Sequence, residues 1–216
     1  MKIEKVIYGA VNQPVLARVP PSAARVLDVG CGTGALGRAV KERMSCELVG
    51  VTHSEAEAEL AAAHIDRVLV CDLNRFEPDG LGEFDCVICS HVLEHLHQPE
   101  RLLKLLQNNL SADGVLLVAL PNVLHWRQRF EFLRGNFKYE DGGLMDRTHY
   151  RFYDWTTAHS LLTDSGYSVV ESEACGGFPL SRYVPTVGRR LDRAALRLSP
   201  GMFGTQFVFI CRASLI

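Results

Sequence analysis

The stretch VLDVGCGTGALG, residues 26–37, decides the fold of this chain. It begins with a short apolar run that ends in glycine, which is typical of a buried strand followed by a tight turn. The residues after the glycines, ALGRAVKERM, have helical spacing. The stretch therefore predicts a strand, a glycine turn and a helix in succession. Its glycines satisfy both G-x-G-x-x-G and G-x-G-x-G, and they are Gly30, Gly32, Gly34 and Gly37.

The same alternation continues along the chain. Helical patterns separate the apolar runs, and the helix after residue 53 begins with Ser54 and Glu57 at capping-box spacing. A parallel crossover needs a connection of about a dozen residues, usually a helix. The alternation therefore predicts an α/β, doubly wound, mostly parallel sheet with helices on both faces. Its first five strands are expected at 24–30, 46–53, 67–72, 84–91 and 114–122.

The pattern breaks after residue 122. Residues 123–153 are rich in aromatic residues, arginine and glycine and lack a clean period, so we interpret them as an inserted lid or substrate segment after strand 5. The whole chain, 1–216, is expected to form a single domain. Its later elements are expected to be a helix at 154–166, strands at 167–175 and 202–213, and a variable surface helix within 176–200.

Composition excludes several classes of protein. The chain has 216 residues, 47% of them hydrophobic, and a formal net charge of -2, so no overall field favours nucleic acid or an anionic membrane surface. A charged partner would therefore have to be bound by a local group of charged residues. No apolar run is long enough to cross a bilayer, and the chain is interpreted as cytoplasmic.

The seven cysteines lie mostly in apolar, strand-like runs, which favours buried reduced thiols over a disulfide framework. Cys86 and Cys89 form C-x-x-C, but positions i and i+3 of a strand face opposite sides of a sheet. Core packing is therefore preferred to a shared metal.

Asp28 separates two interpretations of the glycine turn. A dinucleotide would bring its pyrophosphate to this turn, where a carboxylate repels it. The same carboxylate attracts a cationic ligand, by a few kcal/mol at an effective dielectric constant of about 20. S-adenosylmethionine carries an ammonium and a sulfonium group and no phosphate, so it is the favoured cofactor.

In the type and position of Asp28 and the glycines, VLDVGCGTGALG resembles motif I of the class I S-adenosylmethionine-dependent methyltransferases. The resemblance follows residues 24–122 strand by strand. It implies a Rossmann-like, seven-stranded, mostly parallel sheet whose last strands form an antiparallel pair.

The resemblance also implies a set of cofactor contacts. The end of the second strand departs from the family pattern, because Thr52 and His53 stand where an acid usually binds the ribose. The ribose contact is therefore expected from Thr52, His53 or a shifted Glu55. Asp72 and Leu73 are expected at the adenine, and Ser90 and His91 near the sulfonium. The methionyl part is expected to contact Asp28 and the backbone around Gly30, Cys31, Gly32 and Gly34.

HVLEH, residues 91–95, matches the H-x-x-E-H pattern of inverted zincins. That pattern needs both histidines on one helix, whereas here the first closes a strand, so a protease is not expected. Some related methyltransferases bind a divalent ion through E-x-x-E-H at this turn. The favoured interpretation is that Glu94 and His95 cap the helix and form hydrogen bonds within the fold, without a metal.

The acceptor is expected to be a small molecule methylated on oxygen or nitrogen, with no nucleic acid as partner and a homodimer left open. A histidine is well suited to remove a proton from it, because its pKa lies near neutrality. The candidates are His149, His91 and, third, His125. Four arginines of the insertion could clamp an anionic group or could pair with nearby Glu131, Asp141 and Asp146: Arg127, Arg129, Arg147 and Arg151.

Two alternatives stay open. PNVLHWRQR at 121–129 and DRTHYRFY at 146–153 resemble segments of a bacterial methyltransferase subgroup, some of whose members serve glycan or small-metabolite pathways, and the first also resembles methionine biosynthesis protein W. This second resemblance permits a noncatalytic protein that binds the cofactor and regulates a metabolic enzyme. A dinucleotide oxidoreductase is the other alternative, and Asp28 opposes it.

Overall fold

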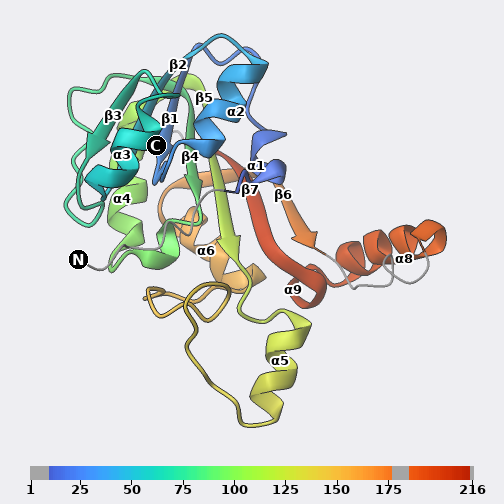
Figure 1. Ribbon diagram of the computed structural model, residues 1–216. Helices are drawn as coiled ribbons and strands as arrows, with labels where there is room; N and C mark the ends of the chain where they lie inside the picture. The colour runs from blue at the N-terminus through green and yellow to red at the C-terminus, as the bar shows by residue number, and fades with distance from the viewer. Residues whose placement is uncertain (1–9, 177–184, 215–216) are drawn as a thin grey trace.

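The computed structural model describes residues 10–176 and 185–214, which build one seven-stranded sheet (Figure 1). The strand order is β3-β2-β1-β4-β5-β7-β6. The first five strands in this order are parallel, and β7 runs antiparallel to both β5 and β6. The predicted fold class is confirmed. The strands are β1 (Arg25–Val29), β2 (Glu47–Thr52), β3 (Arg67–Val70), β4 (Phe84–Ser90), β5 (Leu110–Pro121), β6 (Tyr167–Gly176) and β7 (Gly204–Ala213).

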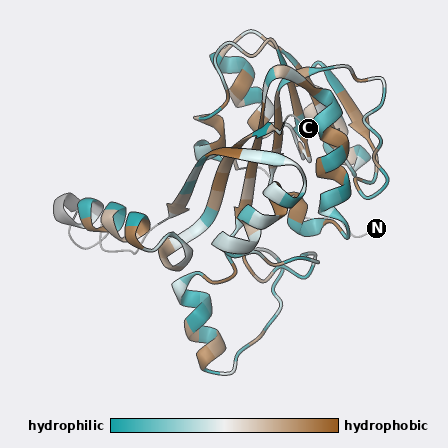
Figure 2. Ribbon diagram, turned by 180° about the vertical axis from the view of Figure 1, so that it is seen from behind, coloured by the Kyte–Doolittle hydropathy of each residue, from teal (hydrophilic) through white to brown (hydrophobic). Residues whose placement is uncertain are grey.

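Side chains alternate between two hydrophobic cores, one on each face of the sheet. On β1, Leu27 and Val29 belong to one core and Val26 to the other, as the period of two in a strand requires. Helices α1 (Gln13–Leu16), α2 (Ala35–Arg43) and α3 (Glu55–Ala61) contribute to the core of Val26, whereas α4 (Pro99–Leu106) and α6 (Trp155–Asp164) contribute to the other. Figure 2 shows the strands largely in the colours of hydrophobic residues.

The same alternation explains the C-x-x-C pair. Cys86 lies in one core and Cys89 in the other, so they cannot share a ligand, as predicted. All seven cysteines are free thiols.

Two element boundaries differ in detail from the sequence-based prediction. Ser54 caps α3 by accepting from the amide of Glu57 at 3.4 Å, but the Glu57 carboxylate accepts from Thr52. The predicted capping box is therefore only half formed. After α4, the 3-10 helix η2 (Gln107–Asn109) leads directly into β5, which begins at Leu110 and not at residue 114 as predicted.

The inserted segment leaves the sheet at the end of β5 and returns before α6. Its two ends are joined, because Val123 donates its amide to the carbonyl of Tyr153 at 2.9 Å. Between them lies α5 (Trp126–Leu133), a helix that the sequence pattern did not predict. None of its residues is buried, and it projects below the carboxyl end of β5 in Figure 1.

The expected surface helix is α8 (Pro185–Leu198), followed by the short α9 (Pro200–Phe203). Residues 177–184 of that predicted region lie outside the described part of the chain. Figures 1 and 2 both show α8 extending away from the sheet. Within the described ranges, no helix combines the length and the apolar character that a membrane crossing requires.

Candidate functional site

The glycine loop joins β1 to α2 at the carboxyl edge of the sheet. Gly30, Gly32 and Gly34 all have positive φ, at 79°, 52° and 80°. A Cβ on Gly30 would lie 2.2 Å from Cγ2 of Val92, and one on Gly34 would lie 2.9 Å from the Cα of Ala61. Glycine is therefore required both by the backbone conformation and by the neighbouring chain.

Asp28 lies under this loop, on the strand that feeds it. Its side chain is 2% exposed, and its Oδ2 atom is buried without a hydrogen-bond partner among the described residues. Burial raises its pKa to about 7. A buried carboxylate without a partner is costly, and it becomes favourable when a cation or a set of N–H donors meets it.

The end of β2 carries an acid after all. The Thr52 hydroxyl donates to Oε2 of Glu57 at 2.6 Å, and the charge of Glu57 also acts on the Cys31 thiol in the glycine loop. Of the three residues predicted for this position, Thr52 is buried, whereas His53 and Glu55 are exposed. The fold thus brings a carboxylate from α3 to Thr52 at the end of β2.

Asp72 and Leu73 follow β3, two and three residues beyond its last residue. Asp72 is exposed, and its Oδ1 atom accepts from the amide and side chain of Asn74 at 2.9 and 3.0 Å. These bonds lower the pKa of Asp72. Leu73 is half-buried against the core that contains Leu27 and Val29. An ionised acceptor and an apolar side chain therefore stand together at the edge of the sheet.

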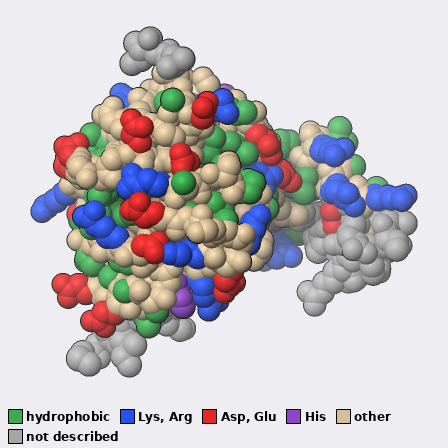
Figure 3. Space-filling model, turned by 90° about the horizontal axis from the view of Figure 1, so that it is seen from above, with side chains coloured by type: hydrophobic (Ala, Val, Ile, Leu, Met, Phe, Trp, Pro, Cys, Tyr) green, Lys and Arg blue, Asp and Glu red, His purple; other side chains and the backbone are tan. Residues whose placement is uncertain are grey.

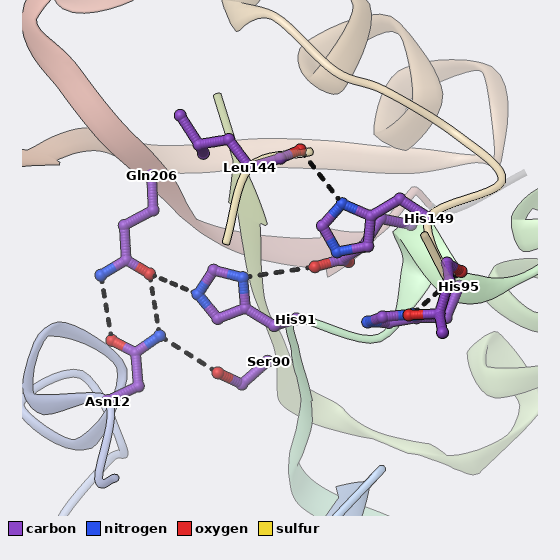
Figure 4. A network of polar contacts seen from close by, with 9 residues as sticks. Asn12, Ser90, His91, His95, Leu144, His149 and Gln206 are labelled. Carbon is purple, nitrogen blue, oxygen red and sulfur yellow. Dashed lines mark hydrogen bonds and ion pairs between the residues drawn. The ribbon is translucent and has the colours of Figure 1, made fainter. Parts of the chain in front are cut away.

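His91 lies at the centre of a polar network at the end of β4 (Figure 4). It has φ 55°, the one positive φ of a non-glycine residue within the described ranges. Its Nδ1 atom lies 3.3 Å from Oε1 of Glu94, and its Nε2 atom 2.8 Å from Oε1 of Gln206. Asn12 joins the same network by donating to Ser90 at 3.1 Å and to Gln206 at 2.9 Å.

This network raises the pKa of His91. Burial lowers its pKa, but the hydrogen bond and charge of Glu94 and the bond to Gln206 outweigh burial, so the pKa lies above its ordinary value. Both ring nitrogens are engaged by oxygen acceptors. Such a histidine is poorly suited to accept a proton, although the sequence placed it among the base candidates.

His149 lies in the returning arm of the insertion. The amides of Tyr150 and Arg151 donate to the carbonyl of Glu94 at 2.8 and 3.1 Å, which holds this arm against the turn after β4. The His149 ring is edge-on to that of His95, with 4.7 Å between centroids. Glu94, His95 and His149 can each direct a ligand atom into a region where all three atoms lie within 4.8 Å of one another.

Hydrogen bonds of the Nδ1 atoms orient the imidazole rings of His149 and His95. Nδ1 of His149 lies 3.3 Å from the carbonyl oxygen of Leu144. When Nδ1 carries the proton and donates a hydrogen bond to this oxygen, Nε2 of the neutral ring has a free lone pair. Burial, with a smaller effect of His95, lowers the pKa of His149 despite the nearby Glu94 charge. Nδ1 of His95 lies 3.2 Å from the carbonyl oxygen and 3.0 Å from the hydroxyl oxygen of Thr148.

The predicted role of Glu94 and His95 as helix caps is wrong, because Gln98 is the N-cap of α4. Their predicted hydrogen bonding within the fold is confirmed by the contacts of Glu94 with His91 and of His95 with Thr148.

A pocket of about 420 Å³ opens beside this cluster. Three aromatic residues, one cation and His149 line it, so it can take a ring with an anionic substituent. The cation, Arg147, is paired with Asp141 at 2.8 Å in an exposed ion pair. The lining residues are Tyr139, Arg147, His149, Tyr150 and Phe152.

The remaining predicted residues of the insertion lie elsewhere. His125 occupies the N-cap position of α5 without a side-chain capping bond. It is buried, its Nε2 atom lacks a hydrogen-bond partner among the described residues, and burial lowers its pKa. Arg127 is exposed and lies over the ring of Trp126, 5.2 Å from its centroid. Arg151 donates to the carbonyl of His97, and Arg129 to that of Leu124. Only Arg147 of the four arginines lines the pocket.

Comparison with known proteins identifies the family. The family model described as "Methyltransferase domain" matches residues 8–172. The chain belongs to this methyltransferase family. The dinucleotide oxidoreductase alternative is thereby set aside.

Curated relatives of this methyltransferase domain include ubiquinone biosynthesis O-methyltransferases. That of Xanthomonas axonopodis pv. citri is 29% identical over 115 residues, which cover 50% of this chain and 47% of the relative. The mitochondrial protein of Bos taurus is 26% identical over 163 residues, covering 69% of this chain and 43% of the relative. The chain therefore spans less than half the length of these relatives.

Solved structures confirm the fold of the methyltransferase. An S-adenosylmethionine-dependent methyltransferase from Mesorhizobium loti has a TM-score of 0.64 and 20% identity, covering 94% of this chain and 98% of that one. Another, from Archaeoglobus fulgidus, has a TM-score of 0.63 and 21% identity, covering 92% and 93%. S-adenosylmethionine is the cofactor that the family and these neighbours support.

The side chains at the carboxyl edge of the sheet fit this cofactor. Oδ2 of Asp28, which has no hydrogen-bond partner among the described residues, would be stabilised by the cationic groups of this cofactor near the glycine loop. Glu57 is the side chain that the sequence did not assign to the site. Its spacing from Ser54 pointed to helix capping, and only the fold brings it to Thr52.

A divalent cation would also find suitable ligands here. Oε2 of Glu94 is fully buried without a hydrogen-bond partner among the described residues, and the two histidines supply nitrogen atoms. One carboxylate and two imidazoles suit zinc or a similar transition metal with an open position. The set differs from the sequence motif, because His149 joins Glu94 and His95 in place of His91.

Proposed function

We propose that this chain transfers a methyl group from S-adenosylmethionine to a hydroxyl oxygen of a small aromatic acceptor. The observation that carries the proposal is the position of His149, which lines the aromatic pocket and at the same time belongs to the cluster with His95 and the buried Glu94. The family membership supplies the reaction class, and the names of the curated relatives support oxygen as the acceptor atom.

The cofactor supplies an electrophilic methyl carbon on a sulfonium. The chain's own task is then to align the acceptor oxygen with that carbon, since alignment can lower a barrier by roughly 7 to 11 kcal/mol. Asp28 and Glu57 hold the donor side of the site in this proposal. The pocket of Tyr139, Tyr150 and Phe152 holds the acceptor ring.

A hydroxyl must lose its proton to become a good nucleophile. Nδ1 of His149 faces the Leu144 carbonyl, so its Nε2 lone pair can accept that proton. The nearby carboxylate of Glu94 stabilises the imidazolium that forms. His91, with both nitrogens engaged, acts in this proposal as a fixed donor that positions Glu94.

Arg147 selects the acceptor. Its partner Asp141 is exposed, and exchange of an exposed ion pair for a substrate carboxylate has little cost. The favoured acceptor is therefore a phenol that carries a carboxylate.

The test uses three commercial phenols as probes: phenol, catechol and 3,4-dihydroxybenzoate. Incubation with S-adenosylmethionine carrying a labelled methyl group should label 3,4-dihydroxybenzoate most strongly. His149→Gln should slow labelling by roughly a hundredfold or more, while calorimetry shows unchanged binding of S-adenosylhomocysteine. Binding of the cofactor without transfer to any of the three phenols would contradict the proposed acceptor and favour the noncatalytic regulator.

A further inference from the structure

Helix α8 presents an exposed surface that the methyltransferase site does not use. One side of this helix is covered, because Gly188 and Asp192 are buried and Leu196 packs against the core that contains Leu27 and Val29. These residues recur every four positions, as one face of a helix requires. Residues on the other side are exposed, and Figures 1 and 2 show the helix projecting away from the sheet.

The exposed side is divided into two stripes. Leu191, Ala194 and Leu198 form an apolar stripe with spacing i, i+3, i+7, and Leu191 and Leu198 are 50% and 86% exposed. A stripe of arginines with the same spacing runs beside it, formed by Arg190, Arg193 and Arg197. Figure 3 shows the blue cations and green apolar side chains of α8 apart from the body.

The charge on this surface has one sign. From Arg190 to Leu198 the acidic residue is Asp192, which lies on the buried side, so the exposed side carries arginines alone. The chain as a whole has a net charge of -2, which makes this positive charge a local feature. Two copies of the same face would bring arginines together and repel each other.

We propose that α8 docks the protein onto an anionic lipid surface, with Leu191 and Leu198 entering the headgroup region and the arginines contacting lipid phosphates. An apolar stripe flanked by cations on a projecting helix is the pattern of helices that lie in the plane of a membrane interface. Attraction of arginines to anionic lipids strengthens such binding and is screened by salt. This peripheral contact needs no membrane-spanning helix.

The experiment measures sedimentation of the full chain with vesicles. One set contains phosphatidylcholine alone, and the other also contains phosphatidylglycerol. The unchanged chain should sediment with the second set and not with the first, and added salt should release it. Arg190→Gln with Arg197→Gln, and separately Leu191→Gln with Leu198→Gln, should each weaken binding roughly tenfold or more.

A control pair away from α8 tests position against composition. Leu60 on α3 is 52% exposed, and the side chain of Arg38 on α2 is 54% exposed, so Leu60→Gln with Arg38→Gln removes similar groups and should leave binding unchanged. Circular dichroism should show that all variants stay folded.

Two outcomes would overturn the proposal. One is failure of the unchanged chain to bind phosphatidylglycerol vesicles. The other is a dimer in light scattering that Leu191→Gln with Leu198→Gln converts to a monomer, because this face would then belong to a second copy. None of these measurements depends on methyl transfer, so they are independent of the proposed function.

Discussion

The hydroxyl of Thr52 donates a 2.6 Å hydrogen bond to the Glu57 carboxylate. This bond places an acid from α3 at the end of β2, where ribose hydroxyls of the cofactor would need an acceptor. We expect Glu57→Gln to weaken binding of S-adenosylhomocysteine roughly tenfold, because a hydrogen bond to a charged group contributes more than one to a neutral group. Calorimetry measures the affinity. Glu55→Gln, an exposed acid on the same helix, is the matched control and should bind normally.

Asp28 makes the stability of the ligand-free chain depend on pH. Its pKa lies at about 7, well above its usual value, because burial disfavours its charge. The folded chain therefore holds a proton that the unfolded chain releases. The resulting stability is fully present below about pH 4 and is lost as the pH rises through about 7. Asn cannot lose that proton, so Asp28→Asn should gain about 1 kcal/mol relative to the unchanged chain between about pH 6 and pH 8.

Urea unfolding at these two pH values, without ligand, measures the effect of Asp28. The same variant should bind S-adenosylmethionine more weakly, because it lacks the charge that attracts the cation. A stability difference independent of pH would show that Asp28 is ionised throughout this range. Unchanged affinity would show that its carboxylate does not face the ligand.

His149→Gln should lower kcat for labelling of 3,4-dihydroxybenzoate by roughly 10²- to 10⁴-fold, the usual contribution of a general base. Binding of S-adenosylhomocysteine should be unchanged. His125→Gln is the matched control, because His125 is also a buried histidine of the insertion but does not line the pocket. Equal losses in both variants would point to damage of the insertion and not to proton transfer.

The sheet could be predicted because its pattern is local. Each strand of the parallel part is an apolar run whose neighbours along the chain are helices, and residues such as Val26 and Leu27 alternate between the two cores as expected. Helix α5 was missed for the complementary reason. Trp126, Phe130 and Leu133 have the helical spacing i, i+4, i+7, but this pattern spans only an eight-residue helix, and none of its residues is buried against a core.

The site was predicted in part. Residue types at strand ends pointed to Asp28 and His91, but the partners of these residues come from distant positions. Asn12 and Gln206, 194 positions apart, are joined to each other and to the end of β4. No local spacing reveals such contacts. The grouping of His149 with Glu94 likewise arises only when the insertion folds back.

Gly30 is expected to be intolerant of a side chain. Gly30→Ala should destabilise the fold by at least about 1 to 2 kcal/mol, because a left-handed backbone disfavours Cβ and the new atom overlaps Val92. Val92→Ala removes the overlapping methyl group but not the backbone strain. Urea unfolding should therefore show that Val92→Ala costs less stability in the Gly30→Ala background than alone. Additive losses would mean that the two residues do not meet.

The cluster of Glu94, His95 and His149 can be tested for metal binding without any acceptor. The geometry leads us to expect that zinc chloride raises the midpoint of thermal unfolding of chelator-treated protein, since a ligand that binds only the folded state stabilises it. The gain should vanish in Glu94→Gln and persist in His159→Gln, which removes an exposed histidine on α6. A gain that survives Glu94→Gln would place the zinc elsewhere. The absence of any gain would instead support the sequence-based prediction of a metal-free site, in which the buried Glu94 carboxylate serves His149 alone.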